Sequence, residues 1–267
     1  TPRWDMPLIA HWTPGEAGAQ HQFHHFLNTR LMGYKEGRDF PGLSQTSRLS
    51  PHLHFGEISV RSIFAAVADA VATDPKLDQD ANAFLSELGW REFSNHLLYH
   101  NPDLPDRPLQ PAFLKFPWAD PQNSDQAEMI DRWKQGQTGV AMVDAGMREL
   151  WATGYMHNRV RMIVGSYLVK NMLTHWRVGE DWFWDTLVDA DLANNATSWQ
   201  WIAGCGADAA PYYRIFNPDL QAEKFDPKGA YRHQWVPEWG TSRYPKPMLD
   251  PKQSRDRALS AFRSLKR

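Results

Sequence analysis

The strongest constraint on the fold is the spacing of apolar residues, which follows the period of an α-helix along most of the chain. Segments with this spacing cover residues 15–34, 56–73, 79–100, 124–135, 139–152 and 154–177, and a basic helix is expected at 251–267. Proline-rich stretches such as residues 101–123 separate them, because proline interrupts a helix. Residues 1–14 hold three prolines and are expected to form an extended arm. The pattern predicts an all-α fold in one domain over residues 1–267.

The composition narrows the class of protein. A chain of 267 residues with 42% apolar residues can bury a sizeable core, and a net charge of −2 gives no general attraction to nucleic acids or membranes. No uninterrupted apolar segment is long enough to cross a bilayer. The single cysteine, Cys205, excludes an internal disulfide framework and suits a reducing compartment, so a cytoplasmic protein is expected.

The most unusual stretch runs from Asp189 to Pro218 and reads DADLANNATSWQWIAGCGADAAPYYRIFNP. Two carboxylates two residues apart precede small polar residues, the triplet Trp-Gln-Trp and a turn rich in glycine and alanine. The chain also holds 13 tryptophans, which suit a tryptophan-rich core or a protein that binds planar ligands and transfers electrons. The stretch predicts the wall of a pocket for a large aromatic ligand. A hydrolase with Asp189 and Asp191 as paired carboxylates stays open as an alternative.

Two other segments have a functional and a simpler structural interpretation. Residues 46–50, Thr-Ser-Arg-Leu-Ser, offer hydroxyl, amide and guanidinium groups that suit phosphate oxygens, but a serine before Pro51 is also a good helix start. Within 79–100, Glu87, Trp90 and Arg91 share a helix face. They could recognise a base by hydrogen bonding and stacking, or form a surface Glu87–Arg91 pair beside a buried tryptophan.

Charge is divided locally although the total is near zero. Residues 145–179 hold five basic residues and one acid, and residues 180–191 hold five acids and no base. Asn158, Arg161 and Met162 share one stripe of the helix expected at 154–177. The basic segment suits a solvated face or a rim that binds a nucleic-acid backbone.

Several chemistries find no support in the motifs. The sequence has no G-x-S-x-G elbow, no G-x-x-x-x-G-K-[ST] loop and no pair of cysteines. Three histidines, at positions 21, 24 and 25, share a helix face, but no fourth ligand accompanies them and no metal site is expected.

Five segments together resemble the flavin-binding region of the DNA photolyase/cryptochrome family. They are GRDFPGLSQTSRLSPHLHFGEIS, ELGWREF, TGYMHNRVRMI, LVDADLANNATSWQWIAGCGADAAPYYRIFNP and KFDPKGAYRHQWVPE, in the family's order and spacing from about Tyr34 to Glu238. The pattern is most similar to class I cyclobutane pyrimidine dimer photolyases, and it implies a multi-helix FAD-binding domain. The resemblance does not extend to the family's N-terminal α/β domain, which binds an antenna chromophore, so we expect that domain to be absent. We therefore expect a fragment without an antenna chromophore, with residues 1–14 as an arm or a remnant of the interdomain linker.

The resemblance assigns one group of residues to FAD. Its members match the family's diphosphate loop, the surroundings of the isoalloxazine ring and adenosine, and the position facing flavin N5: Tyr34, Thr46, Ser47, Arg48, Leu49, Ser50, Phe84, Arg161, Asp189, Asp191 and Asn195. Asparagine at position 195 is typical of photolyases, whereas plant-type cryptochromes have aspartate there. A neutral amide leaves the reduced anionic flavin unprotonated at N5, while an acid can protonate it.

The resemblance assigns a second group to the flipped-out lesion and its strand. Its members are Glu87, Trp90, Arg91, Asn158, Arg159, Met162, Trp201 and Gln221. Because (6-4) photolyases have a histidine where Asn158 stands, the cyclobutane lesion is the implied substrate. Trp199, Trp176 and Trp118 match the family's electron-transfer chain. Trp199 and Trp201 point about 200° apart in a helix, so one can face this chain and the other the substrate.

The implied activity is that of a deoxyribodipyrimidine photo-lyase, which repairs DNA with light. Reduced anionic FAD absorbs a photon and donates an electron to a pyrimidine dimer flipped out of damaged DNA, the cyclobutane ring splits, and the electron returns. Glu87 would hydrogen-bond the thymine edge, Trp90 and Trp201 would stack on the lesion, and Asn195 and the three chain tryptophans would serve the electron transfer. The alternative is a cryptochrome-type blue-light sensor without repair activity. A monomer beside the nucleoid is expected, with the missing antenna domain as a partner and no membrane contact.

Three features depart from the family's pattern. Gly139-Val140-Ala141-Met142 stands where the family usually has Tyr or Ile followed by Pro after Thr-Gly. Phe84 occupies a position that holds an indole in some relatives. Residues 119–132 are longer than usual between Trp118 and Trp133.

Overall fold

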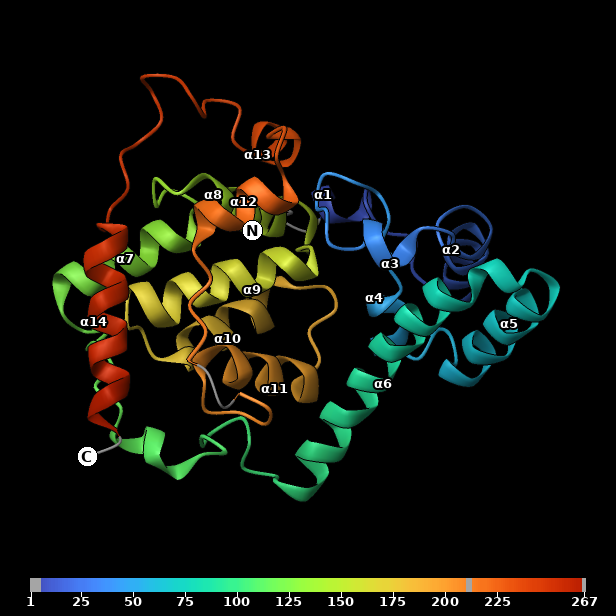
Figure 1. Ribbon diagram of the computed structural model, residues 1–267, viewed down its shortest axis with the longest axis horizontal. Helices are drawn as coiled ribbons and strands as arrows, with labels where there is room; N and C mark the ends of the chain where they lie inside the picture. The colour runs from blue at the N-terminus through green and yellow to red at the C-terminus, as the bar shows by residue number, and fades with distance from the viewer. Residues whose placement is uncertain (1–5, 210–212, 266–267) are drawn as a thin grey trace.

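The computed structural model describes residues 6–209 and 213–265, and within these ranges the chain is helical and has no β-strand. In chain order the elements are α1 (Met6–Ile9), α2 (Glu16–Thr29), α3 (Tyr34–Gly37), α4 (Ser50–His54), α5 (Val60–Thr73), η1 (Pro75–Leu77), α6 (Asp78–His100), η2 (Pro111–Lys115), α7 (Ser124–Lys134), α8 (Ala141–Thr153), α9 (Asn158–Ser166), η3 (Tyr167–Asn171), α10 (Trp176–Thr186), α11 (Leu192–Ala203), α12 (Pro218–Phe225), α13 (Ala230–Trp235) and α14 (Pro251–Ser264) (Figure 1). The predicted all-α class is confirmed. No helix in the described ranges has the length and apolar character that a membrane span requires.

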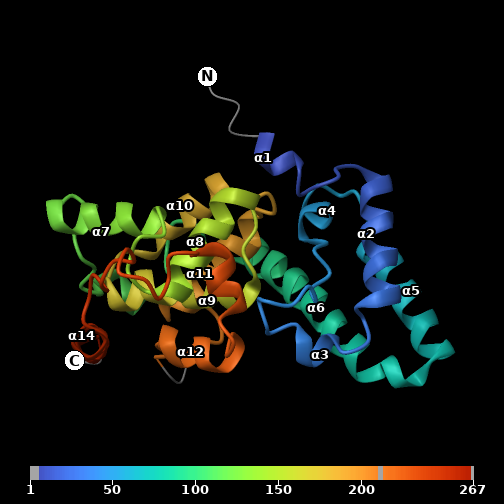
Figure 2. The ribbon, with the colours of Figure 1, turned by 90° about the horizontal axis from the view of Figure 1, so that it is seen from above.

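The helices enclose two apolar cores. The larger core is built mainly by α7 to α11 and α14, and its fully buried side chains include Trp133, Met147 and Trp176. The smaller core is built by α2 to α6 around Phe26 and Ile63. In Figures 1 and 2 the helices α2 to α5 lie on one side of the molecule and α7 to α14 on the other. The long helix α6 belongs to the smaller core and contacts α11 of the larger one, so it joins the two sides.

The helix predicted at 154–177 is wrong at both ends. The structure has two α-helices there, α9 and α10, separated by the π-helical turn η3 and by a break at Leu173, whose φ is 55°. His157 and His175 cap the two helices, because each ring Nδ1 accepts a hydrogen bond at 3.2 Å from the backbone N–H two residues further on. Histidine is not among the usual N-cap residues, so the sequence pattern did not reveal these starts.

The predicted extended arm over residues 1–14 is interrupted by a helical turn, whereas residues 12–14 have no regular secondary structure. Residues 6–9 form one turn of helix, α1, with Pro7 in the first turn, where proline is tolerated. Leu8 packs towards α8, since its Cδ2 lies 3.4 Å from the place that a Cβ would take on Gly154. Residues 1–5 of the arm lie outside the described residues.

Candidate functional site

The hydroxyl-rich loop between α3 and α4 is held in place by neighbouring elements. Gln22 Nε2 donates to the Ser47 carbonyl oxygen at 2.7 Å, and Thr46 Oγ1 lies 3.4 Å from the Tyr155 hydroxyl. The interpretation as a helix start with a serine cap is wrong in detail, because Leu49 precedes the first turn of α4 and no side chain caps it. Ser47 Oγ accepts from the Leu49 backbone N–H at 3.4 Å, just before the helix, and Ser50 is the first residue of α4 and does not cap it.

Arg48 is the residue of this loop that most clearly lacks a protein partner. Its φ of 54° turns the backbone, and its guanidinium carbon lies 4.5 Å from the ring centre of Trp12 and 4.9 Å from that of Tyr155. Among the described residues, buried Arg48 Nη2 has no hydrogen-bond partner. A buried cationic N–H without an acceptor is costly, and a phosphate oxygen would satisfy it. The loop therefore fits the diphosphate of FAD.

The two aspartates that open the 189–218 stretch have different partners. Buried Asp189 accepts hydrogen bonds from Arg161 Nη2 at 3.0 and 2.8 Å, while Arg161 Nε donates to the Met156 carbonyl oxygen at 2.7 Å. Asp191 caps α11, accepting from the backbone and side-chain nitrogens of Asn194 at 2.9 and 2.6 Å. Since one carboxylate is neutralised and the other is a helix cap, the hydrolase alternative loses its basis.

Asn195 lies one turn into α11 and is almost fully buried. Its Nδ2 donates to the backbone carbonyl oxygen of Glu180 at 3.0 Å, which fixes the orientation of the amide. Burial, followed by the charge of Asp181, raises the pKa of Glu180 to about 8, although Arg177 acts in the opposite direction. The amide of Asn195 is thus tied to the backbone of α10 at Glu180, whose side chain stays protonated near neutral pH.

Tyr34 and Phe84, both matched to FAD, lie together in the smaller core. Their ring centres are 5.5 Å apart in an edge-to-face arrangement, and each ring also packs against Phe26. Both side chains are buried. Arg38 lies over the Tyr34 ring at 5.5 Å and links this cluster to α6 through an ion pair with Glu87.

The predicted surface pair between Glu87 and Arg91 is wrong. Glu87 pairs with Arg38, which precedes α4 in the chain, whereas Arg91 pairs with Glu92 at 2.8 Å and donates to the Leu53 carbonyl oxygen at 3.3 Å. Trp90 is 56% exposed, and its ring packs edge-on against a neighbouring phenylalanine of α6. The indole is therefore not a core residue, and its exposed face is free to stack on a planar group.

The other residues matched to DNA gather at α9 and α12. Asn158 is exposed, and Arg159 donates to Asp39 Oδ1 at 2.6 Å and lies 3.8 Å from the Met162 sulfur. The Arg159 guanidinium also lies 4.4 Å from the ring centre of Phe225, at the end of α12. Gln221 lies one turn earlier on α12, and its buried Oε1 has no partner among the described residues. The structure thus brings Arg159 and Met162 into contact and places Gln221 on the neighbouring helix.

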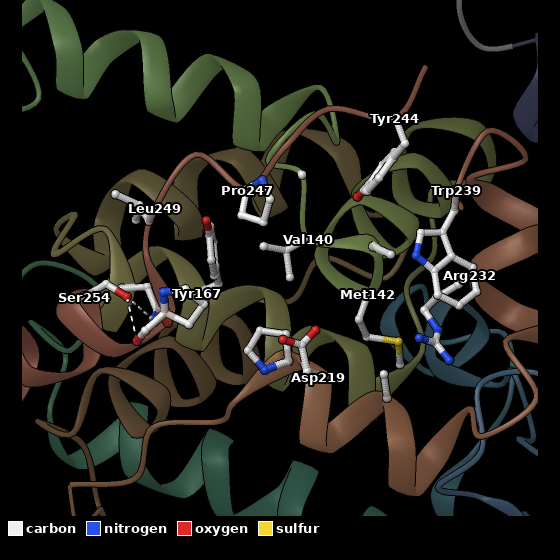
Figure 3. Close-up of a pocket in the computed structure, with 16 residues that line it drawn as sticks. Val140, Met142, Tyr167, Asp219, Arg232, Trp239, Tyr244, Pro247, Leu249 and Ser254 are labelled. Carbon is white, nitrogen blue, oxygen red and sulfur yellow. Dashed lines mark hydrogen bonds between the residues drawn. The ribbon is translucent and has the colours of Figure 1, made fainter. Parts of the chain in front are cut away.

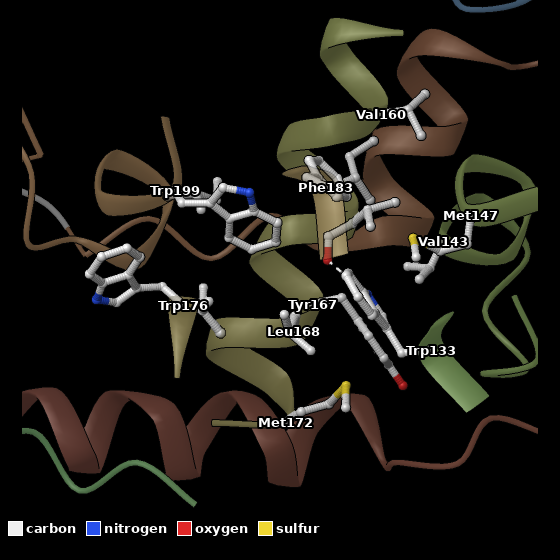
Figure 4. Close-up of a cluster of buried hydrophobic side chains, with 14 of the residues drawn as sticks. Trp133, Val143, Met147, Val160, Tyr167, Leu168, Met172, Trp176, Phe183 and Trp199 are labelled. Carbon is white, nitrogen blue, oxygen red and sulfur yellow. Dashed lines mark hydrogen bonds between the residues drawn. The ribbon is translucent and has the colours of Figure 1, made fainter. Parts of the chain in front are cut away.

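The tryptophans of α11 point into different surroundings, as predicted. Trp199 is 3% exposed and packs against Phe183 at 4.9 Å and Trp133 at 6.5 Å, and Trp176 belongs to the same cluster (Figure 4). Trp201 is half-buried and lies instead beside Phe216 and under the guanidinium of an arginine. The two indoles of one helix therefore face two different regions.

Trp118 lies at the surface end of the same tryptophan series. Its ring centre is 5.1 Å from that of His175, which in turn lies 5.4 Å from that of Trp176. A backbone hydrogen bond from Ala119 to Leu173, 2.9 Å long, holds the two segments together. The longer segment that follows Trp118 therefore does not move it away from the start of α10.

The comparison with known proteins decides the family. A family model for the FAD binding domain of DNA photolyase matches residues 84–243. The chain belongs to this family. It is 44% identical to the deoxyribodipyrimidine photo-lyase of Agrobacterium fabrum over 100% of this chain and 59% of that protein, and 42% identical to cryptochrome-1 of Arabidopsis thaliana over 86% and 34%.

Solved structures of the family have the same fold. The crystal structure of a bacterial class III photolyase from Agrobacterium tumefaciens superposes with a TM-score of 0.92 at 44% identity, covering 100% of this chain and 59% of that one. This chain therefore spans little more than half the length of the photolyases it matches. These matches show the family. They do not single out class I, because a class III photolyase and a cryptochrome are both among the relatives, so the similarity to class I stays an interpretation of the motifs.

The photolyase-family site includes residues that the sequence did not indicate. Tyr155 and Trp12 flank Arg48, Arg38 pairs with Glu87, and Glu180 holds Asn195. These residues lie far from their partners in the sequence and meet them only through the tertiary fold. Glu180 alone among them could have been found from the sequence, because it lies one helical turn after Trp176 on α10. Within the described residues no three His, Cys, Asp or Glu side chains come together in a way that could hold a metal ion.

Proposed function

We propose that this chain is the FAD- and DNA-binding part of a deoxyribodipyrimidine photo-lyase that repairs cyclobutane pyrimidine dimers with light. The observation that carries the proposal is the division of α11. Asn195 and Trp199 lie on the side of α11 that packs against α10, whereas Trp201 lies on another side of the helix, beside Phe216 at the half-buried edge of the same core. A repair enzyme needs two such sides, because the flavin that donates the electron and the DNA lesion that accepts it must lie close together in neighbouring sites.

FAD would be held by two sets of groups. Thr46, Ser47 and Arg48 offer hydroxyl oxygens and an unpaired guanidinium nitrogen to the diphosphate. On the other side the Arg161–Asp189 pair and Asn195 supply a positioned ion pair and an amide for the ring. When bound, the flavin supplies the absorption of light and the transfer of an electron, and the protein supplies position and electrostatics.

The lesion would be received by α6, α9 and α11. Trp90 and Trp201 would stack on the flipped-out bases, each contributing about 1–3 kcal/mol, which offsets the few kcal/mol needed to extrude a poorly paired dimer. Glu87 would accept a hydrogen bond from the N–H of a thymine edge, held at that place by Arg38. Asn158, Arg159, Met162, Arg91 and Gln221 would position the damaged strand. Such an enzyme would work on DNA in the cytoplasm, as a monomer.

Trp118, Trp176 and Trp199 would carry electrons from the surface to an oxidised flavin. The series ends on Trp199, which lies in the same cluster as Trp176. This relay serves reduction of the cofactor and not repair itself, so the two can be tested apart.

A second candidate is a blue-light sensor of the cryptochrome type, which the 42% identity to cryptochrome-1 of Arabidopsis thaliana supports. Asn195 favours repair, because an amide at that place does not supply a proton to flavin N5, whereas the aspartate of plant-type cryptochromes can.

The deciding experiment uses the chain loaded with FAD and chemically reduced. It is illuminated with an oligonucleotide that contains one thymine dimer, and the recovery of thymine absorbance is followed, with a dark sample as control. We expect light-dependent recovery. Absence of recovery with FAD bound would contradict the repair function and leave the sensor, and failure to bind FAD would contradict the whole proposal.

Glu87→Ala and Glu87→Gln sharpen this experiment. We expect Glu87→Ala to lower the repair yield about tenfold, as expected for loss of a charge-assisted hydrogen bond, while FAD content stays unchanged. Glu87→Gln keeps a hydrogen-bonding group and should retain more activity. Loss of FAD from either variant would count against a role at the lesion.

A further inference from the structure

A cavity of about 150 Å³ lies at the far side of the larger core, between the start of α8, the η3 turn and the segment that leads from α13 to α14 (Figure 3). Of the described residues that line it, none is a candidate for binding flavin or DNA. Its wall is largely apolar and includes Val140, Met142, Pro247 and Leu249. An apolar cavity of about this volume accommodates one benzene-sized ring.

Two buried polar atoms in this wall lack partners. Tyr167 is 3% exposed and Asn171 is 5% exposed, and among the described residues neither the Tyr167 hydroxyl nor Asn171 Oδ1 has a hydrogen-bond partner. The Asn171 amide nitrogen donates to Ser254 Oγ at 2.9 Å, which leaves its oxygen as an acceptor. Because unpaired buried polar groups are unfavourable, these two atoms point to a ligand with an O–H or N–H group.

The charges around the cavity favour an uncharged ligand. Of the described lining residues only Arg232 is positively charged, and it is already paired with Asp226 at 2.9 Å and lies 4.1 Å from the ring centre of Trp239. Behind the first turn of α8, the buried carboxylate of Asp144 accepts hydrogen bonds from Thr138, Gly139 and Tyr244. An anion would meet this carboxylate and no free cation. The one carboxylate among the described lining residues, Asp219, is exposed to solvent, so a cation bound to it would lie at the mouth and outside the buried wall.

The cavity coincides with a departure of the sequence from its family. Gly139, Val140, Ala141 and Met142 all line it, and Val140 and Ala141 follow Thr138-Gly139, where the family usually has Tyr or Ile followed by Pro. Figure 3 shows Val140 projecting between Tyr167, Pro247 and Met142. A tyrosine at position 140 would add a ring to this wall and reduce the space.

We infer that this cavity binds one small uncharged aromatic molecule that carries a hydroxyl or N–H group. The ring lies against the apolar wall around Val140 and Leu249. The polar group pairs with the Tyr167 hydroxyl, which can both donate and accept, and it can also donate to Asn171 Oδ1. The site is separate from the flavin and DNA sites, so the inference does not depend on the proposed function.

The test is a fluorine NMR titration of the full chain with 4-fluorophenol. We expect a saturable change in the fluorine shift that Val140→Tyr abolishes and that Tyr167→Phe weakens about fivefold, as for loss of one hydrogen bond. Fluorobenzene, which lacks the hydroxyl, should bind more weakly than 4-fluorophenol. Trp184→Phe, at an exposed tryptophan outside the cavity, is the matched control and should leave the titration unchanged.

Three outcomes would overturn the inference. They are the absence of saturable binding, unchanged binding in a folded Val140→Tyr, and binding of the charged 4-fluorobenzoate as tight as that of 4-fluorophenol. Far-UV circular dichroism and a cooperative urea transition show whether Val140→Tyr is folded. If that variant does not fold, Tyr167→Phe decides, because equal binding to wild type and Tyr167→Phe would remove the hydrogen bond on which the site rests.

Discussion

The two faces of α11 differ in packing although they share one helix. On the inner face Trp199 is buried, and Gly179 of α10 comes so close that a Cβ there would lie 2.1 Å from the indole. On the outer face Trp201 is half-buried and has looser neighbours, Phe216 and Arg214. A tightly packed indole has one orientation, as an electron relay requires, whereas a partly exposed one can admit a substrate. The difference in packing agrees with the roles proposed for the two indoles.

Gly179→Ala should break the inner face and have the largest effect. The added methyl group overlaps the ring of Trp199, so we expect a loss of about 1–3 kcal/mol in the free energy of unfolding, measured by urea denaturation. Gly89→Ala on α6 is the matched control, because a Cβ there meets nothing within 4 Å. It should stabilise the protein by about 0.5–1 kcal/mol, since alanine is the better helix former. Equal effects of the two variants would contradict the close packing.

Trp176→Phe should separate the inner relay from repair. Photoreduction of oxidised FAD is expected to fall strongly, because the indole between Trp118 and Trp199 is removed, while repair by chemically reduced protein stays at the wild-type level. Flash absorption of the flavin measures the first quantity and thymine recovery the second. Unchanged photoreduction would refute the relay through Trp176.

Trp201→Ala should affect the outer face alone. We expect weaker binding of dimer-containing DNA by about 1–3 kcal/mol, the usual contribution of one stacked base, with normal photoreduction of FAD. Binding is measured by fluorescence anisotropy, and undamaged DNA is the control. A parallel loss of photoreduction would mean that the two faces of α11 are not independent.

Glu180→Gln tests the inner face through the pH dependence of stability. The folded-state pKa of Glu180 is raised by burial from its ordinary value of 4.5 to about 8, so the fold favours the protonated acid. Its contribution to stability is therefore fully present below about 4.5 and is lost as the pH rises through about 8. We expect the urea midpoint of Glu180→Gln to exceed that of the wild type increasingly over this window. A constant difference at all pH values would show that Glu180 does not titrate there.

The fold class and the family could be predicted from the sequence, whereas several tertiary contacts could not. The all-α class, the family and the opposed directions of Trp199 and Trp201 were predicted, because helical periodicity and motif spacing depend on neighbours along the chain. The break before α10 was not, since its cap is a histidine. The pairing of Glu87 with Arg38 was not either, because it joins residues 49 positions apart, and a helical neighbour offered the simpler partner.

What the sequence determined by itself is the set of groups in the Asp189–Pro218 stretch and the angle between its two tryptophans, which follows from 3.6 residues per turn. Only the tertiary structure decided what each group meets. It placed Asp189 on Arg161, made Asp191 a helix cap, tied Asn195 to the Glu180 carbonyl and left Arg48 with an unpaired nitrogen. The reason is physical. A carboxylate, an amide and a guanidinium can each pair with several kinds of group, and the partner that each one finds depends on which segments the two cores bring together.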